Sequence, residues 1–215
     1  MFPLRPSLYF EIAAFAASVI FWYKIKHTRM RWLMFYLFLI VSVELAGRYI
    51  SRELHKPNYW LYNISVPVEY LFYTALFYWH YTLSRNRILA RWFLMLFPVF
   101  VLINLLAIQG LHQFNNNFLK IGSLSMIIFS CLYFYEILTS EEIIHPPGIP
   151  MFWIAIGVFL FNTGEFVYSA ASDTLIPYWR KWRPTFQLIN NNLIYVLYSF
   201  IIIAILSFLW TPQKK

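Results

Sequence analysis

Seven apolar stretches of about twenty residues, divided by short polar segments, constrain this chain more than any other feature. Their approximate ranges are 7–23, 31–50, 59–81, 88–108, 118–138, 151–171 and 187–209. A segment inside a bilayer must pair its own backbone amides, as a helix or within a closed barrel. The stretches do not alternate strictly between apolar and polar residues, which favours helices. We therefore expect an all-α polytopic membrane protein, a bundle of seven transmembrane helices in one integral membrane domain over 1–215.

The charged residues are few and grouped. They make up 12% of the 215 residues, while 60% are hydrophobic, and a soluble domain has about 25% charged residues. The net charge of +8 would suggest nucleic-acid binding in a soluble protein. Here the basic residues lie between apolar stretches, as loop anchors and topology signals do. We expect contact with the lipid bilayer, no nucleic-acid partner, and no room for a nucleotide-binding or kinase domain.

The basic residues around the first stretch indicate its orientation. Lys24, Lys26, Arg29 and Arg31 follow it, whereas Arg5 alone precedes it. The side with more Lys and Arg next to the first helix is usually cytoplasmic. The sequence therefore predicts an N-terminus outside and a C-terminus in the cytoplasm.

Two kinds of residue predict local structure. Pro150 and Pro184 precede the sixth and seventh stretches, and proline suits the first turn of a helix. Pro67 and Pro98 lie inside stretches, where they predict kinks. The single cysteine, Cys131, lies within an apolar run, so we expect a buried structural thiol and no intrachain disulfide.

The order of polar residues suggests an internal repeat. Glu44 lies in the second stretch and Glu165 in the sixth, and the stretch after each carries asparagine and then tyrosines: Asn63, Tyr70 and Tyr73, and Asn191, Tyr195 and Tyr198. This order fits two three-helix units joined by a linker helix, a 3+1+3 arrangement. The first helices of the two units, with Glu11 and Lys120, do not match chemically. Common origin and coincidence therefore both stay open.

Carboxylates at membrane depth are the informative side chains. Each costs about 2.5 to 3.5 kcal/mol at a helix centre, so it is usually turned inward, paired or functional. Glu44, Glu69 and Glu165 lie well inside their stretches. Glu69 has no basic residue within one helical turn, so it could donate a hydrogen bond, carry a proton or bind a cation.

Four further residues accompany these carboxylates in the predicted ligand-binding set: Arg48, Tyr73, Tyr168 and Asn191. Arg48 lies four residues after Glu44 and shares its helix face. It either forms an ion pair with Glu44 or binds an anionic group bidentately. Asn191 belongs to a run of three asparagines, for which interhelical hydrogen bonding is the alternative role.

Several enzyme classes have no support in the sequence. It contains no His-x-x-x-His or Cys-x-x-Cys spacing, no Gly-x-Ser-x-Gly motif and no glycine-rich phosphate loop. No lysine lies inside the seventh stretch, where a retinal Schiff base would need one. We expect no enzymatic activity, no metal site and no cofactor.

The end of the chain carries a resemblance. The run Gly157 to Glu165, followed by Asn191 to Tyr198, resembles small seven-helix bacterial inner-membrane proteins of unassigned function. Some of these resemble the membrane portions of sensor kinases. The resemblance covers the last third of the chain and implies an inner-membrane location. No catalytic or binding residue is assigned from it. A sensor of this kind would have to signal through a separate partner protein.

These observations lead to one hypothesis and two alternatives. The hypothesis is a non-enzymatic receptor or sensor-like subunit that binds a small or lipid-like ligand among the second, third, sixth and seventh helices. The first alternative is a small facilitator or proton-coupled transporter, in which Glu69 and Glu165 carry protons or bind a cation. The second is a structural subunit of a larger membrane complex.

Overall fold

The computed structural model describes residues 6–209, apart from 112, 114, 141–145 and 176–178, and every regular element in that part is helical. In chain order the elements are α1 (Pro6–Ile20), α2 (Trp22–Ile25), α3 (Arg31–Arg52), α4 (Tyr59–His80), α5 (Ser84–Ile103), a π-helical turn η1 (Asn104–Ile108), α6 (Asn116–Leu138), a 3₁₀ turn η2 (Pro146–Gly148), α7 (Pro150–Leu175) and α8 (Trp179–Ser207). The all-α prediction is confirmed for these residues.

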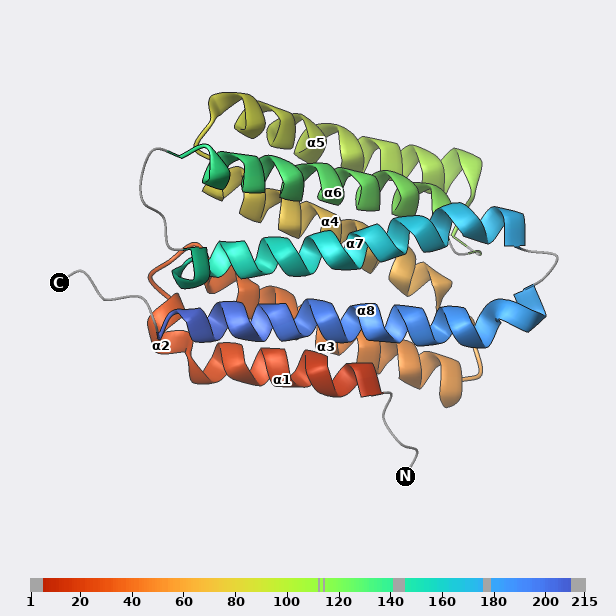
Figure 1. The fold of residues 1–215 in the computed structure, drawn as a ribbon. Helices are drawn as coiled ribbons and strands as arrows, with labels where there is room; N and C mark the ends of the chain where they lie inside the picture. Colours follow the sequence, from red (N-terminus) through yellow and green to blue (C-terminus); the bar gives the residue numbers. More distant parts are fainter. Residues whose placement is uncertain (1–5, 112, 114, 141–145, 176–178, 210–215) are drawn as a thin grey trace.

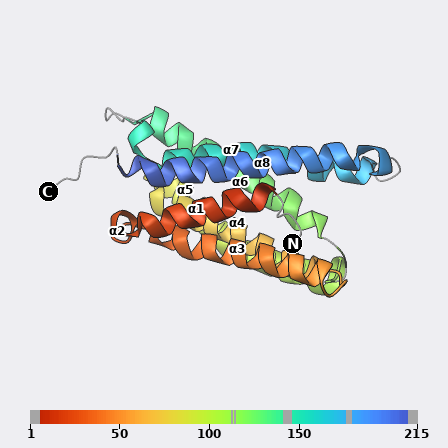
Figure 2. The ribbon, with the colours of Figure 1, turned by 90° about the horizontal axis from the view of Figure 1, so that it is seen from below.

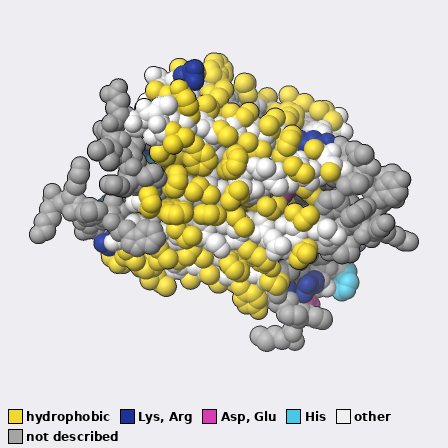
Figure 3. All heavy atoms as spheres, in the orientation of Figure 1, with side chains coloured by type: hydrophobic (Ala, Val, Ile, Leu, Met, Phe, Trp, Pro, Cys, Tyr) yellow, Lys and Arg dark blue, Asp and Glu magenta, His cyan; other side chains and the backbone are white. Residues whose placement is uncertain are grey.

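Within the described residues, five helices are long and apolar enough to cross a membrane: α3, α5 with η1, α6, α7 and α8. Helix α1 is apolar but has 15 residues, and α4 has 22 residues with many tyrosines. Hydrophobic side chains cover the middle of the face seen in Figure 3, and basic side chains lie toward its ends. The architecture is that expected of an integral membrane protein, whereas the count of seven spans stays a prediction.

The helix boundaries follow the apolar stretches with three differences. The first stretch is divided, because α1 ends at Ile20 and α2 is a separate turn. Helix α5 begins at Ser84, before the predicted 88, and α8 begins at Trp179, before the predicted 187. Arginine and lysine are good helix formers, so these helices continue into basic segments that the apolar pattern leaves out. Pro150 opens α7 as predicted, but Pro184 lies inside α8.

Six helices form a closed ring. Helix α1 packs against α3 and α8, α3 packs against α4, α4 against α6, α6 against α7, and α7 against α8. Helix α5 lies outside this ring, against α4 and α6. Figures 1 and 2 show the helices side by side along one direction, with the first and last helices in contact. The ring therefore encloses an interior, and α5 packs against the outside of the ring.

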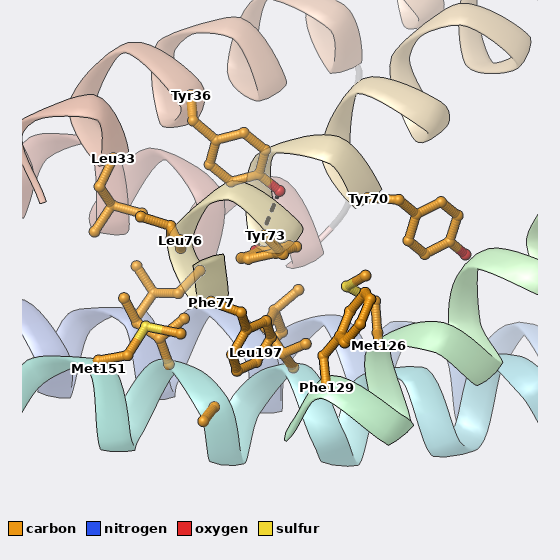
Figure 4. Packing of buried hydrophobic residues seen from close by; sticks show 14 of the residues in the cluster. Leu33, Tyr36, Tyr70, Tyr73, Leu76, Phe77, Met126, Phe129, Met151 and Leu197 are labelled. Carbon is orange, nitrogen blue, oxygen red and sulfur yellow. Dashed lines mark hydrogen bonds between the residues drawn. The ribbon is translucent and has the colours of Figure 1, made fainter. Parts of the chain in front are cut away.

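One end of this interior is filled by large side chains. Tyr36, Tyr73, Phe77, Met126 and Leu197 are buried together in the core (Figure 4). They come from the first half of α3, the second halves of α4 and α8, and the middle of α6. We call this the closed end of the bundle. The opposite end contains the end of α3 and the start of α4.

A close approach between α4 and α6 depends on Gly122. A Cβ atom at this position would lie 2.3 Å from the Tyr70 ring, which is closer than atoms can pack. The missing side chain lets the Tyr70 ring lie directly on the α6 backbone. The small residue thereby brings the two helices together, as small residues do at membrane helix contacts.

The prediction for Cys131 is wrong. The thiol is exposed on α6. The buried side chains of that part of α6 are Met126, Phe129, Ser130 and Tyr133, which define the inward face at helical spacing. Residue 131 is turned about 100° from residue 130, so it points away from the bundle. An apolar environment in the sequence does not distinguish lipid contact from burial.

Glu136 fixes the turn between α4 and α5 at the closed end. Its carboxylate accepts hydrogen bonds from the Thr82 backbone N–H (2.6 Å), the Thr82 hydroxyl (2.7 Å), the Leu83 N–H (3.3 Å) and the Asn86 side-chain amide (2.6 Å). These donors lie at the start of α5. A carboxylate at this place accepts hydrogen bonds from the free N–H groups and interacts favourably with the positive end of the helix dipole. Glu136 thus connects the end of α6 to the beginning of α5.

We predict that Glu136→Gln lowers the free energy of unfolding by about 2–3 kcal/mol, since hydrogen bonds to a charged group contribute more than neutral ones. The side-chain NH₂ group of the glutamine would also face the hydrogen-bond donors of Thr82, Leu83 and Asn86. Thermal unfolding of the purified protein in detergent measures the effect, and Glu53→Gln, at the exposed end of α3, is the control. Equal melting temperatures for the two variants would contradict this role of Glu136.

Candidate functional site

A cavity of about 190 Å³ lies inside the ring, on the side away from the closed end. Every helix of the ring contributes to its wall, and α5 contributes nothing among the lining residues. They are Glu11 from α1; Ile40, Val43 and Glu44 from α3; Tyr62, Ser65, Val66, Glu69 and Tyr70 from α4; Leu119 from α6; Phe161 and Glu165 from α7; and Asn190, Ile194, Leu197 and Tyr198 from α8.

Four glutamates line this cavity, each from a different helix: Glu11, Glu44, Glu69 and Glu165. Glu11 is 4% exposed and Glu165 is 9% exposed. One oxygen of Glu11, Oε2, is buried without a hydrogen-bond partner among the described residues. The three carboxylates that the sequence singled out are thus brought together, with a fourth beside them.

A second hollow of about 380 Å³ continues from the cavity to the end of the bundle. The two share Glu11, Glu44, Tyr62, Asn190 and Ile194. The outer hollow is further lined by Arg48, Arg52, Asn58, Tyr59 and Asn191, among others. We call it the mouth. Negative side chains therefore line the inner cavity, and both arginines lie in the mouth.

Helical spacing explains why these side chains share a wall. On α3 the lining residues are Ile40, Val43, Glu44, Gly47, Arg48, Ser51 and Arg52, which follow the three- and four-residue spacing of one helix face. On α4 the same spacing joins Tyr62, Ser65, Val66 and Glu69. Each helix thus turns one polar stripe toward the interior.

The carboxylates are close enough to interact through their charges. Glu44 and Glu69 act on Glu11, and Glu44 and Glu165 act on Glu69. Ionised groups of one sign in an apolar surrounding repel each other and are poorly solvated. Protons, a neighbouring cationic side chain or a bound cation therefore balance part of their charge. Arg48 and Arg52 line the mouth together with Glu11 and Glu44, whereas Glu69 and Glu165 line only the inner cavity.

Tyr73 lies next to the cavity rather than on its wall. It is 1% exposed and belongs to the buried core. Its hydroxyl accepts a hydrogen bond from that of Tyr36 at 3.1 Å (Figure 4), and Tyr36 is close enough to Glu69 to interact with its carboxylate. Tyr73 is therefore linked to the carboxylates indirectly, through Tyr36.

The other predicted residues divide between the mouth and the outside of the cavity. Asn191 and Arg48 line the mouth. Tyr168 is not among the lining residues, but it is close enough to interact electrostatically with Glu165. The predicted set is thus grouped around one space, with Tyr73 and Tyr168 behind its wall.

Sequence reasoning missed Glu11, Tyr62, Asn190 and Tyr198, all of which line the cavity. A signal for Glu11 was present. It is a lone carboxylate in an apolar stretch, and Ser7 stands four residues before it on the same helix face. The tyrosines carry no comparable signal, because the chain contains 16 of them.

The chain matches no family model, no curated protein and no solved structure. Within the described part of the chain, no three His, Cys, Asp or Glu side chains are grouped as metal ligands. The site is therefore interpreted from its own geometry.

We predict that the cavity is open to water through the mouth. In a Cys131→Ala background, Ser65→Cys on the cavity wall should react many-fold faster with a cationic methanethiosulfonate reagent than with an anionic one of similar size. The carboxylates attract the cation. Rates can be followed by mass spectrometry of the intact protein.

Ser123→Cys is the matched control, because Ser123 is fully buried on α6 and does not line the cavity. It should react slowly with both reagents. Equal rates at positions 65 and 123, or a preference for the anionic reagent at position 65, would show that the cavity is closed or not negative.

Proposed function

We propose that this chain is a receptor or sensor-like membrane subunit that binds a small organic cation in the carboxylate cavity. The observation that carries the proposal is the convergence of four glutamates, from four helices, on one cavity. Ionisable residues at membrane depth are costly and usually mark a ligand or ion pathway. A cation bound among these carboxylates would balance their charge. No enzymatic activity is proposed.

The cavity also indicates what kind of cation fits. A cavity of 150 Å³ lined by apolar side chains admits benzene, so about 190 Å³ accommodates a molecule slightly larger than benzene. Tyr62, Tyr70, Phe161 and Tyr198 line the cavity with the carboxylates, and aromatic rings attract both apolar groups and cations. An amine with a small apolar body, or the amine head of a lipid-like molecule, has this chemistry. An additional anionic group on the ligand would meet Arg48 at the mouth.

The remaining features of the proposal concern placement in the membrane. With the N-terminus outside, the mouth at the start of α1 faces the exterior, and a ligand enters from there. The proposed location is a bacterial inner membrane, and a separate partner protein would carry the signal onward. The 3+1+3 arrangement is supported by α5, which packs outside the ring and in chain order separates α1, α3 and α4 from α6, α7 and α8.

Benzylamine tests the proposal directly, because benzyl alcohol and benzoate have nearly the same shape with no charge or a negative charge. We expect benzylamine to raise the melting temperature of the purified protein, and the other two to have no comparable effect. Calorimetric titration then gives the affinity.

Glu69→Gln and Glu165→Gln should each weaken benzylamine binding about 10- to 100-fold, since a hydrogen bond to a charged group contributes about 1.5–3 kcal/mol. Glu53→Gln changes an exposed glutamate that caps the end of α3 and lines neither the cavity nor the mouth, so this variant should bind as the unaltered protein does. Stabilisation by benzyl alcohol to the same extent, or unchanged affinity in both cavity variants, would contradict the proposal.

A second candidate function is proton-coupled transport. It is supported by the hydrogen-bonded hydroxyls of Tyr36 and Tyr73, which extend from Glu69 toward the closed end. Hydrogen-bonded polar groups of this kind can relay protons through a membrane protein.

Proteoliposomes with a pH gradient separate the two functions. A transporter accumulates radiolabelled benzylamine in response to the gradient, and Glu69→Gln abolishes that accumulation. A receptor binds the amine without accumulating it. Gradient-driven uptake that depends on Glu69 would therefore replace the receptor proposal.

A further inference from the structure

A second pocket lies at the closed end, opposite the mouth. Its volume is about 400 Å³, and it is formed by the connection between α2 and α3 and by the last turn of α4. His27, Thr28, Arg29, Arg31, Trp32 and Trp79 line it. The pocket thus combines two guanidinium groups with two indole rings, and it contains no part of the carboxylate site.

Arginines from the α2–α3 connection and from the first turns of α5 converge on the end of α4. A guanidinium N–H of Arg29 donates to the Trp79 carbonyl oxygen. Arg87 Nε donates to the Tyr81 carbonyl oxygen (2.8 Å), and Arg91 Nη2 donates to the Tyr78 hydroxyl (3.2 Å). Each bond uses one of five N–H donors of its guanidinium. All three side chains are exposed, so donors remain for a ligand.

The tryptophans place this pocket at the depth of the lipid headgroups. Helix α3, one of the five helices able to cross a membrane, begins at Arg31. The Arg31 guanidinium lies over the Trp32 ring at 5.4 Å. Trp residues gather at the membrane surface, where one edge is apolar and the other is hydrated. A ligand in this pocket therefore contacts the arginine side chains at the depth of the lipid phosphates and also the edge of the hydrocarbon layer.

An apolar stripe continues from the pocket along α3. Trp32, Phe35 and Leu39 are exposed and lie three and four residues apart, so they share one face of the helix. The rings of Trp32 and Phe35 are in contact, with centroids 5.8 Å apart. A free anion would make no use of this stripe, whereas an acyl chain would lie along it.

We propose that this pocket binds the phosphate of an anionic phospholipid. Arg29 and Arg31 bind the phosphate oxygens, for which the planar guanidinium is well shaped. Arg87 and Arg91 add positive charge from the neighbouring helix, and an acyl chain follows the exposed face of α3. The carboxylate described at this end, Glu136, is already bound to the α4–α5 turn. The proposal is independent of the function of the cavity.

The experiment measures lipid retention and stability of the purified protein in mild detergent. Phosphatidylglycerol is added in one arm, phosphatidylcholine in the second and inorganic phosphate in the third. We expect phosphatidylglycerol to stay bound in native mass spectrometry and to raise the melting temperature. Phosphatidylcholine and inorganic phosphate should do neither at the same concentration.

Arg29→Gln combined with Arg31→Gln should reduce phosphatidylglycerol retention at least about 10-fold, as expected for the loss of charge-assisted bonds. The matched control for the single variant Arg31→Gln is Lys56→Gln, which removes one exposed charge at the mouth end and lines neither this pocket nor the mouth. Arg31→Gln alone keeps the Arg29–Trp79 bond and therefore tests lipid binding even if the double variant is unstable. Equal retention in the Arg31 variant and the control would overturn the proposal, and so would equal stabilisation by inorganic phosphate.

Discussion

The contact between α1 and α8 closes the ring, and the hollow interior depends on it. These are the first and last long helices of the chain, so their packing is the most distant in sequence of all the helix pairs in the ring. Bringing these two helices together closes a longer loop than any other contact in the ring, which costs more entropy than closing the short connections. Without it, the carboxylates on α1 and α3 would face lipid instead of one another. Enclosure of the cavity thus depends on the pair of ring helices that lies farthest apart in the sequence.

The buried polar side chains differ in how many of their hydrogen-bonding atoms have a partner in the fold. Glu136 accepts bonds from Thr82, Leu83 and Asn86. Asn63 is similarly engaged, since its side chain donates to the Gln113 carbonyl oxygen (2.9 Å) and accepts from the Asn115 N–H (3.2 Å). Such groups hold helices and turns together. Glu11, by contrast, retains a buried oxygen without a partner in the described residues, which is the arrangement of a site that awaits a proton or a ligand.

Much of the architecture could be predicted from hydrophobic length alone, because a lipid bilayer requires helices of a fixed minimum span. Glu44, Glu69 and Glu165 could be selected for the same reason, since the membrane makes every internal carboxylate expensive. Which face of a helix is buried could not be predicted. In water, burial and hydrophobicity go together, but in a membrane apolar side chains face both the core and the lipid. Cys131 on the outside of α6 and Tyr73 behind the cavity wall are consequences of that ambiguity.

The position of α5 outside the ring also determines which neighbouring helices of the ring are consecutive in the chain. Because α5 returns the chain to the mouth end, α6 starts where α4 started, and these neighbours run parallel. The same holds for α1 and α8. The other four neighbouring pairs are antiparallel and joined directly, so the ring consists of two covalent three-helix groups that meet along two seams. The seam between α4 and α6 is the one where Gly122 admits the Tyr70 ring. Separation along the seams would open the cavity sideways toward lipid and leave each three-helix group intact.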